Sequence, residues 1–470
     1  MPCSPRAPPF CPFSANARLL APSLPLATGH SCGTPRANPR SGSASRRRKP
    51  HPPPTMSSSP SANRGWIVAF AGLGINLVLG ALYAWGVIAK ALVLQLGWTK
   101  ANAGLPFAIC TASFAVMMIF AGRMQDKMGP RRVAQLGGLL FGLGLAASGF
   151  VSTPLTMALT FGVLGGIGIG LGYSATTPPA MKWFPPARKG LITGLVVAGV
   201  GSAAIYISPL TQWLLGRWQP GQTSIQNTFL VLGAGAFVLI LLFSLLLENP
   251  PAGYKPVGLA PAAGSPARPA AAQRDRDWPE MLKTPQFYLL WLIYVLSAAA
   301  GLMLIANAPI IAKEQAAWEA GFVGVMILAA FNTIGRILAG FVSDRFGRTR
   351  TMVLAFILQA VNMALFIRYD TQVLMIFGTA FTGLCYGTIF TLMPAATADF
   401  YGVRNLGVNY GFVFTGFGVA GVLGSRYGGM IRDFFGTYAM AYKICAAMLV
   451  VAAVLAFCTK APKTTEAKAG

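Results

Sequence analysis

The feature that most constrains this chain is an alternation of long apolar stretches with short polar connections, which begins near Trp66 and continues to Cys458. A hydrocarbon core about 30 Å thick is crossed by about 20 helical residues at 1.5 Å each. The stretches of that length lie near 66–89, 101–122, 133–151, 155–175, 190–215, 227–247, 286–311, 319–342, 351–368, 371–393, 406–427 and 438–458. They are continuously apolar and do not alternate as membrane strands do. The sequence therefore predicts an all-α membrane protein with twelve transmembrane helices.

One connection differs from the others and divides the apolar body into two halves. It is rich in proline and carries alternating charges at 274–277, a composition typical of a solvated linker. We therefore expect a six-helix bundle over 64–247, a linker over 248–285, a second six-helix bundle over 286–460 and a cytoplasmic tail over 461–470.

The region before the first apolar stretch, residues 1–63, is rich in Pro, Ser, Ala and Arg and contains no acidic residue. Its best candidate for a signal-peptide core, 19–27, is broken by two prolines. We expect a disordered basic tail. An alternative start of translation at Met56 would remove most of it.

The net charge of +25 raises the question of a nucleic-acid partner. The basic residues, however, lie in short runs between apolar stretches, which is the pattern that sets membrane topology. With the Arg64 end in the cytoplasm, the cytoplasmic connections carry more than twice as many Lys and Arg as those on the opposite side. We therefore expect a plasma (inner) membrane protein with both termini cytoplasmic, embedded in the lipid bilayer as a monomer, and no nucleic-acid partner.

Catalytic side chains are scarce in the apolar body. Both histidines, His30 and His51, lie in the tail, and the cysteines show no metal-ligand spacing. We expect no enzyme, no metal site and no cofactor, with a proton or a counter-anion as the coupling ion. The glycine run from Gly165 to Gly172 lies within an apolar stretch, so it predicts close helix packing and not a nucleotide loop.

Two connections in corresponding places share the pattern Gly-x-x-x-Asp-[Lys/Arg]-x-Gly with further basic residues. The first contains Gly122, Asp126, Lys127, Gly129 and Arg131, and the second contains Gly340, Asp344, Arg345, Gly347 and Arg348. A glycine permits a tight turn or a close helix contact. An aspartate accepts hydrogen bonds from basic neighbours or from the free N–H groups at a helix start. The repeat indicates that the two halves are built alike.

This pair of loops resembles the signature of the major facilitator superfamily, in which two six-helix halves rock about a central site. The resemblance covers residues 64–460 and implies the twelve-helix fold of that superfamily. It also implies that the two loops are conformational gate elements, in which Asp126 and Asp344 steady one transport state.

Other fragments resemble the oxalate/formate antiporter family and its monocarboxylate-carrying relatives. They are Leu82-Tyr83-Ala84-Trp85-Gly86, the segments 168–173 and 182–185, Asn332-Thr333-Ile334-Gly335-Arg336 and Asn409-Tyr410-Gly411. Their order and their places on the predicted helices carry the resemblance. It implies secondary transport of a small organic carboxylate.

Arg336 is the most informative single residue. It lies eight residues before Asp344, hence about 12 Å below the end of its helix. A guanidinium at that depth costs at least about 2.5–3.5 kcal/mol and stays charged. No Asp or Glu lies in the interior of an apolar stretch, so Arg336 needs an anion or a wet cavity, and its fork matches a carboxylate. Asn332, one turn earlier, shares its helix face and is placed to bind the same ligand. An arginine that only braces backbone carbonyls is the alternative.

Tyr83, Tyr173 and Tyr386 are aromatic residues near the middle of their predicted helices. Each alone is more often a packing residue, but together they would wall a small ligand and donate to its oxygens. The family resemblance implies aromatic residues from these helices around the site. It also implies that the arginine matching Arg336 grips the substrate.

The sequence departs from the oxalate pattern in one respect. Oxalate-exchanging members of the family pair the arginine of the eighth membrane span with a lysine in the eleventh, whereas this chain has no Lys or Arg between Gly407 and Gly424. Phe417 stands about where that lysine would be. One buried positive charge balances one carboxylate, and a dianion would leave a second charge uncompensated. We therefore predict a monocarboxylate such as formate, lactate or pyruvate, carried by antiport or proton symport.

Two other functions fit an apolar twelve-helix body. An exporter of amphipathic drugs would use a large apolar cavity and would not need Arg336. A membrane receptor built on a transporter scaffold would need a globular extension, and neither the linker nor the tail indicates one.

Overall fold

The computed structural model describes residues 62–251, 253–254, 275–318 and 321–462. Within these ranges the regular structure is helical, and no strand occurs. The long helices follow the apolar runs of the sequence, and several begin at a side-chain cap. Thr99, for example, accepts the backbone N–H of Asn102 at 3.2 Å before α3 (Lys100–Met128). The predicted tail before residue 62 and the linker residues 255–274 lie outside the described residues.

The helices up to residue 244 form the first bundle. They are α1 (Ala62–Leu79), the 3-10 segment η1 (Gly80–Ala84), α2 (Trp85–Leu96), α3, α4 (Pro130–Ser148), α5 (Pro154–Met157), the π-helical segment η2 (Ala158–Gly165), α6 (Gly166–Ser174), α7 (Thr177–Lys182), the 3-10 segment η3 (Pro186–Arg188), α8 (Lys189–Arg217) and α9 (Gln222–Ser244).

The helices from residue 285 onward form the second bundle. They are α11 (Pro285–Ala316), α12 (Gly321–Phe346), α13 (Arg348–Leu365), the 3-10 segment η4 (Phe366–Arg368), α14 (Gln372–Tyr401), α15 (Leu406–Phe435) and α16 (Ala439–Cys458). The short helix α10 (Trp278–Leu282) precedes them, inside the predicted linker, where the sequence analysis expected no helix.

Eleven helical segments of the described chain are long and apolar enough to cross a membrane. The remaining predicted span corresponds to α4, whose first turn contains Arg131 and Arg132 and is therefore less apolar. Together they give the predicted twelve-helix arrangement, so the fold class is confirmed. The first span runs continuously through α1, η1 and α2 from Asn63 to Leu96, which is longer than the predicted 66–89.

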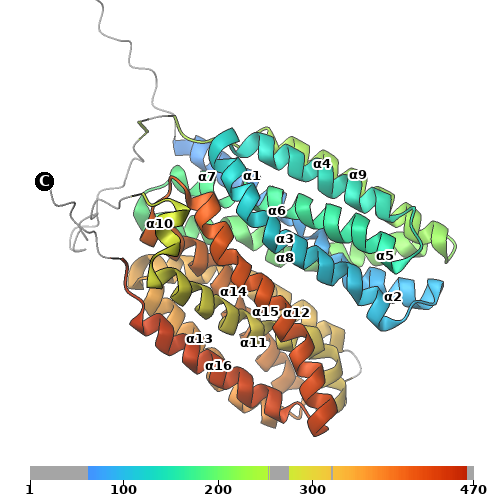
Figure 1. Ribbon diagram of the computed structural model, residues 1–470. Helices are drawn as coiled ribbons and strands as arrows, with labels where there is room; N and C mark the ends of the chain where they lie inside the picture. The colour runs from blue at the N-terminus through green and yellow to red at the C-terminus, as the bar shows by residue number, and fades with distance from the viewer. Residues whose placement is uncertain (1–61, 252, 255–274, 319–320, 463–470) are drawn as a thin grey trace, which may run out of the picture. The chain divides into compact units, whose positions relative to one another are not determined.

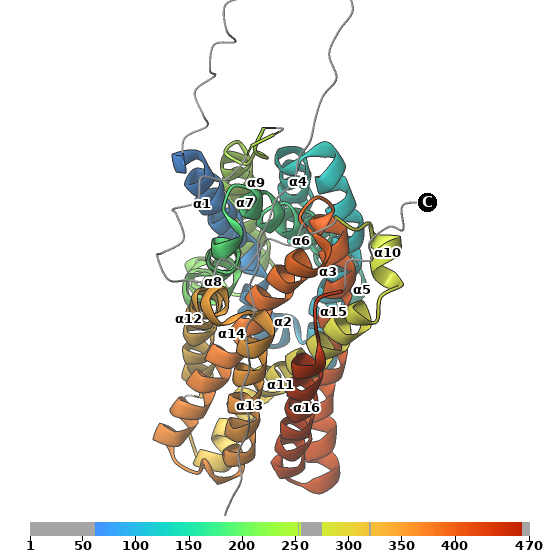
Figure 2. The ribbon, with the colours of Figure 1, turned by 90° about the vertical axis from the view of Figure 1, so that its left-hand side faces the viewer.

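Helices of each bundle pack mainly on one another, as Figures 1 and 2 show in blue to yellow-green for the first bundle and yellow to red for the second. In the first, α4 packs on α9 and α1 on α8; in the second, α11 packs on α15 and α13 on α16. Two pairs of helices make most of the contact between the bundles: α12 packs on α8, and α15 packs on α3, with a smaller contact between α14 and α8. Three of these helices, α3, α12 and α15, carry motifs on which the family resemblance rests.

Glycines permit several of the closest helix contacts. In the run predicted to pack closely, a Cβ on Gly166 would lie 2.5 Å from the Cys110 carbonyl oxygen of α3, and one on Gly168 would lie 2.3 Å from the Phe141 nitrogen of α4. The prediction of close packing by this run is confirmed.

At the end of the first bundle, Arg64 Nη2 donates to Glu248 Oε2 at 3.0 Å. This exposed pair lowers the pKa of the Glu248 carboxyl.

Candidate binding site and paired loops

Arg336 is held at the contact between the two bundles. It lies on α12, ten residues before the end of that helix, and only 1% of its side chain surface is exposed. Small residues let the neighbouring helices approach it. A Cβ on Gly335 would lie 2.1 Å from the Leu384 carbonyl oxygen of α14, and one on Gly201 of α8 would lie 3.1 Å from Arg336 Nε. The sequence therefore buries a permanent charge between α8, α12 and α14.

The guanidinium of Arg336 is only partly satisfied by the protein. Its Nε donates to Asn332 Oδ1 at 2.9 Å, and its Nη1 donates to the Val197 carbonyl of α8. Its central carbon lies 4.3 Å from the centroid of the Phe390 ring, a cation–π contact. The remaining nitrogen, Nη2, is buried and has no hydrogen-bond partner among the described residues. No described carboxylate forms an ion pair with Arg336.

Aromatic side chains from both bundles form one connected group of ring contacts that includes Phe390, the ring beside the guanidinium, and we call this group the aromatic cluster. Its members are Phe114 and Tyr173 of the first bundle and Tyr294, Tyr386, Phe390, Tyr410, Phe414 and Phe417 of the second. The Phe390 ring, which contacts Arg336, lies 5.2 Å from both the Tyr386 and the Phe417 ring, measured between ring centroids. Tyr83, half-buried on η1, lies near enough to Tyr386 and Tyr173 to interact with them electrostatically.

Three tyrosine hydroxyls in the aromatic cluster interact with one another and have no other hydrogen-bond partner among the described residues. They belong to Tyr173, Tyr294 and Tyr410, whose side chains are at most 4% exposed. A buried hydroxyl with few partners costs free energy, so a group of such hydroxyls needs a structural or functional reason. Here they lie together, around the same guanidinium that has a free nitrogen.

The first of the two repeated loops joins α3 to the opposite bundle. Asp126, near the end of α3, accepts the backbone N–H of Val408 at 3.2 Å, at the start of α15. The free N–H groups of a helix start carry partial positive charge, so they favour a carboxylate. Gly122 makes the contact possible, because a Cβ there would lie 2.1 Å from the Gly407 carbonyl oxygen.

The second loop makes the corresponding contact from the second bundle to the first. Asp344 accepts the backbone N–H groups of Gly190 and Leu191, at 2.9 and 2.8 Å, at the start of α8. A Cβ on Gly340 would lie 2.3 Å from the Gly190 carbonyl oxygen. Each loop therefore places one carboxylate on a helix start of the other bundle.

Glycines also shape the turns that follow these two aspartates. Gly129 and Gly347 adopt φ angles of +85° and +93°, which L side chains rarely adopt. The basic residues that the pattern includes are arranged less uniformly. Lys127, Arg131 and Arg345 are exposed, whereas Arg348 is buried and binds Asp344 at 2.7 Å.

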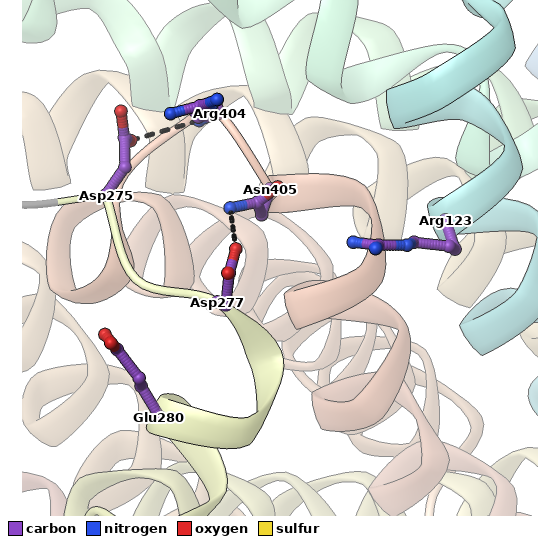
Figure 3. A pocket seen from close by; sticks show the side chains of 6 residues that line it. All are labelled: Arg123, Asp275, Asp277, Glu280, Arg404 and Asn405. Carbon is purple, nitrogen blue, oxygen red and sulfur yellow. Dashed lines mark hydrogen bonds between the residues drawn. The ribbon is translucent and has the colours of Figure 1, made fainter.

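A separate cavity of about 320 Å³ lies beside the first loop and is drawn in Figure 3. Its lining residues are charged or polar: Arg123, Asp275, Asp277, Glu280, Arg404 and Asn405. Asp275 accepts the backbone N–H of Arg404 at 3.2 Å, and Asp277 accepts from the Asn405 amide. These bonds fasten the residues before α10 to the connection between α14 and α15. The cavity does not include Arg336 or the aromatic cluster.

The model of the family described as Major Facilitator Superfamily matches residues 65–361 and 290–470 of this chain. The chain belongs to the Major Facilitator Superfamily. It is a multi-pass membrane protein, and the resemblance inferred from the paired loops is confirmed.

Relatives within the superfamily include carriers of small carboxylates. The oxalate:formate antiporter of Oxalobacter formigenes is 30% identical, over 80% of this chain and 86% of that protein. Monocarboxylate transporter 13 of Rattus norvegicus is 24% identical, over 83% of this chain and 88% of that protein. The solved structure of the proton:xylose symporter XylE shares the fold, with a TM-score of 0.63, 14% identity and coverage of 84% and 96% of the two chains.

The structure of this superfamily member brings most of the predicted site residues together. Arg336, Tyr173, Tyr386 and Phe417 belong to one group of contacts, and Tyr83 borders it. Asn332 accepts the Arg336 Nε–H through its Oδ1 and so orients the guanidinium, and its predicted contact with a ligand stays a prediction.

The sequence analysis missed four members of the aromatic cluster and gave a fifth no role at the site. Phe114, Tyr294, Phe390 and Phe414 lie on helices that are apolar all round, so no periodicity distinguishes their faces. Tyr410 appeared only as part of the resembling fragment Asn409-Tyr410-Gly411. Its place in that fragment, at the start of α15, was the usable signal.

Proposed function

We propose that this protein is a secondary active transporter that carries a small monocarboxylate by alternating access. The observation that carries the proposal is the unpaired Nη2 of Arg336, buried at the contact between the bundles with no ion-paired carboxylate among the residues described. A buried cation needs an anionic partner, and a guanidinium binds a carboxylate through a charge-assisted hydrogen bond. The named activities of the two carboxylate-carrying relatives support the same class of substrate.

The proposal of one carboxylate instead of two rests on charge. Among the aromatic cluster and the residues that touch Arg336, the guanidinium is the one permanent positive charge described. The centroid of the Phe417 ring lies 5.2 Å from that of Phe390, the ring in contact with Arg336. A lysine in the place of Phe417 would therefore lie near enough to bind a second carboxylate. A dianion such as oxalate would keep one charge uncompensated in a region of low polarity.

The paired loops control the change between the two states of alternating access. Each carboxylate holds a helix start of the opposite bundle, so both contacts must break before the loop end of the bundles opens. The substrate would then bind while the loops are joined and leave after they part. Because the loop end carries the excess of Lys and Arg, we place it, with both termini, in the cytoplasm, and the protein in the plasma membrane as a monomer.

Uptake of labelled lactate into proteoliposomes tests this function. We expect unlabelled monocarboxylates to compete, and we expect Arg336→Lys to reduce uptake at least tenfold, since lysine keeps the charge but loses the fork that also binds Asn332 and Val197. Arg217→Lys is the matched control, because Arg217 lies over the largely exposed ring of Trp213. A pH gradient across the vesicle separates proton symport from exchange against an internal anion.

The result that contradicts the proposal is specific. If no carboxylate competes, and transport of an uncharged or cationic amphipathic compound continues unchanged in Arg336→Lys, the protein is a drug exporter instead. Placing lysine at Phe417 gives a second readout, because Phe417→Lys is expected to increase competition by oxalate.

A further inference from the structure

The end of the linker that leads into α11 is fixed to the second bundle by hydrogen bonds and a ring contact. The Arg276 N–H donates to the Tyr401 carbonyl at 3.0 Å, and the Asn409 amide donates to the Arg276 carbonyl at 3.0 Å. The Trp278 ring of α10 stacks on Phe412 of α15, with 5.4 Å between the ring centroids. The side chains of this segment therefore keep a set place beside the loop end of the second bundle.

Asp275 lies where this attachment is closest. Its Oδ1 accepts the backbone N–H of Arg404 at 3.2 Å, and Figure 3 shows this bond. Gly402 turns the chain there with a φ of +84°, and a Cβ on it would lie 2.1 Å from Asp275 Oδ1. The corner after α14 is thus shaped to hold this carboxylate.

Two lysines of the first bundle lie within electrostatic reach of the same carboxylate. Lys182 ends α7 and is half-buried, while Lys189 begins α8 and is 7% exposed. Both interact electrostatically with Asp275. Enclosing an ammonium group is costly unless negative charge compensates it, so a carboxylate near these lysines stabilises the arrangement that encloses them.

Asp275 thereby connects the charges of the two repeated loops. Lys182 also interacts with Asp126 of the first loop. Lys189 Nζ lies 3.9 Å from Asp399 Oδ1, and Arg348 of the second loop binds the same carboxylate. Among the described residues, Asp275 is the carboxylate that acts on both lysines.

The opposite end of the linker is held by the first bundle, at the residue next to Lys182. Trp183 Nε1 donates to the Glu248 carbonyl at 3.0 Å, and the Tyr254 ring lies 5.1 Å from the Trp183 ring. Residue 254 is therefore attached to the first bundle and residue 275 to the second. The linker bridges the contact that must part when the loop end opens.

We propose that the linker forms a third contact between the bundles, in which Asp275, held by the second bundle, attracts Lys182 and Lys189 of the first bundle and stabilises the closed loop end. The repeated loops join the bundles through helix starts, whereas this contact acts through charge. The inference goes beyond the proposed function, because it concerns the change of state and does not depend on which substrate is carried.

Thiol labelling of a cysteine at the closed contact tests this inference in the full chain. Val408→Cys is the reporter, because Val408 begins the α15 side of the first-loop contact and is 3% exposed. The same chain without this cysteine gives the background. Asp275→Asn keeps Oδ1 as an acceptor for Arg404 and removes only the charge. We expect it to raise the labelling rate of the reporter about threefold, as the loss of one partly solvated charge interaction would.

Two further measurements show whether the effect acts through charge. Asp275 is exposed, so at about 1 M salt the reporter should be labelled at nearly the same rate with and without Asp275→Asn. The increase should also shrink when Lys182→Gln or Lys189→Gln is already present, because each removes one target of the carboxylate.

Asp277→Asn is the matched control. Asp277 lies two residues later in the same exposed segment and binds the Asn405 amide through Oδ1, which asparagine retains. It is not among the groups that act on the two lysines, so its loss of charge should leave labelling unchanged.

The contradicting results are distinct from those for the proposed function. Unchanged labelling in Asp275→Asn overturns the inference. Equal increases in Asp275→Asn and Asp277→Asn overturn it too, since they would mean that attachment of the segment matters and the charge on the lysines does not. An increase that persists at high salt and in both lysine variants has the same consequence. Labelling needs no substrate, so none of these results depends on whether a carboxylate is transported.

Discussion

The two repeated loops make the same contact across the bundles but differ in how their aspartates are balanced. Asp344 lies 2.7 Å from the buried Arg348, four residues later, and Arg348 continues to Asp399 at 3.0 Å. The position four residues after Asp126 is Pro130, the first residue of α4, which has no charge and no N–H to offer. Asp126 Oδ1 has no hydrogen-bond partner within the described ranges. The second loop thus contains a close ion pair, whereas in the first loop Lys182 and Arg123 interact with Asp126 only over a longer distance.

This difference shows that the shared sequence pattern has two roles: it joins the two bundles, and in the second loop it also holds the aspartate in place. The carboxylate on a helix start and the glycine contact occur in both loops, and both cross between the bundles. The pair of Asp344 with Arg348 lies within the second bundle, where it fixes the carboxylate in place. What joins the halves is therefore the helix start and the close backbone contact, while the arginine adds local stability in one loop only.

The largest expected effect comes from changing the glycine contacts that both loops share. Gly122→Ala and Gly340→Ala each place a Cβ within 2.3 Å of a backbone oxygen of the opposite bundle, so the helices must separate. Overpacking costs about 1–3 kcal/mol, so we expect each change to reduce lactate uptake about tenfold or more. Thiol labelling of a cysteine introduced at Asn405 should increase, because the loop end opens. Gly104→Ala on α3 is the control, since nothing lies within 4 Å of its Cβ position. Normal uptake in either variant would show that the two contacts are not equivalent.

A smaller and unequal effect is expected from removing the charges. Asp126→Asn and Asp344→Asn should both slow transport, with little change in equilibrium substrate binding, because neither carboxylate touches the aromatic cluster. Asp344→Asn also leaves Arg348, 8% exposed, with one carboxylate fewer. We expect it to lower the free energy of unfolding by about 1–3 kcal/mol more than Asp126→Asn does. Thermal unfolding in detergent measures this difference, and Asp433→Asn, at a largely exposed carboxylate, is the control. Equal losses of stability would contradict the assigned role of Arg348.

Parts of this arrangement could be predicted from the sequence because they follow from the properties of single residues. An arginine inside an apolar stretch needs a partner wherever the helix packs, so Arg336 was identifiable. The repeated Gly and Asp positions were identifiable because they recur at one spacing. The neighbours of Arg336 on α11 and α14 were not, because these helices are apolar on most of their surface and give no period that separates lipid-facing from bundle-facing rings.

The two loops also contain a difference that the sequence does not predict, namely which basic residue reaches the aspartate. Pro130 and Arg348 occupy corresponding positions and both are visible in the sequence, but a pattern of basic residues does not say which of them reach the aspartate. Lys127, Arg131 and Arg345 satisfy the pattern and remain exposed. The distance between an arginine and a carboxylate depends on where the next helix begins, and that is a property of the fold.

The smallest expected effect comes from making the loops alike. Pro130→Arg places an arginine four residues after Asp126, as Arg348 follows Asp344. Pro130 is buried, as Arg348 is, and a new ion pair there should stabilise the joined loops by about 1 kcal/mol. Losing proline at the first position of α4 costs about 0.4–1 kcal/mol through the entropy of the unfolded chain, so the unfolding temperature should change little. The contribution of the ion pair can be separated from the effect of losing proline by measuring Pro130→Arg alone and together with Asp126→Asn. Only the ion pair needs the Asp126 carboxylate. We expect thiol labelling at the Asn405→Cys reporter to fall several-fold with Asp126 present and to stay constant without it. Equal labelling changes in both backgrounds would mean that the arginine acts elsewhere, and the charge difference between the loops would then have no part in holding them closed.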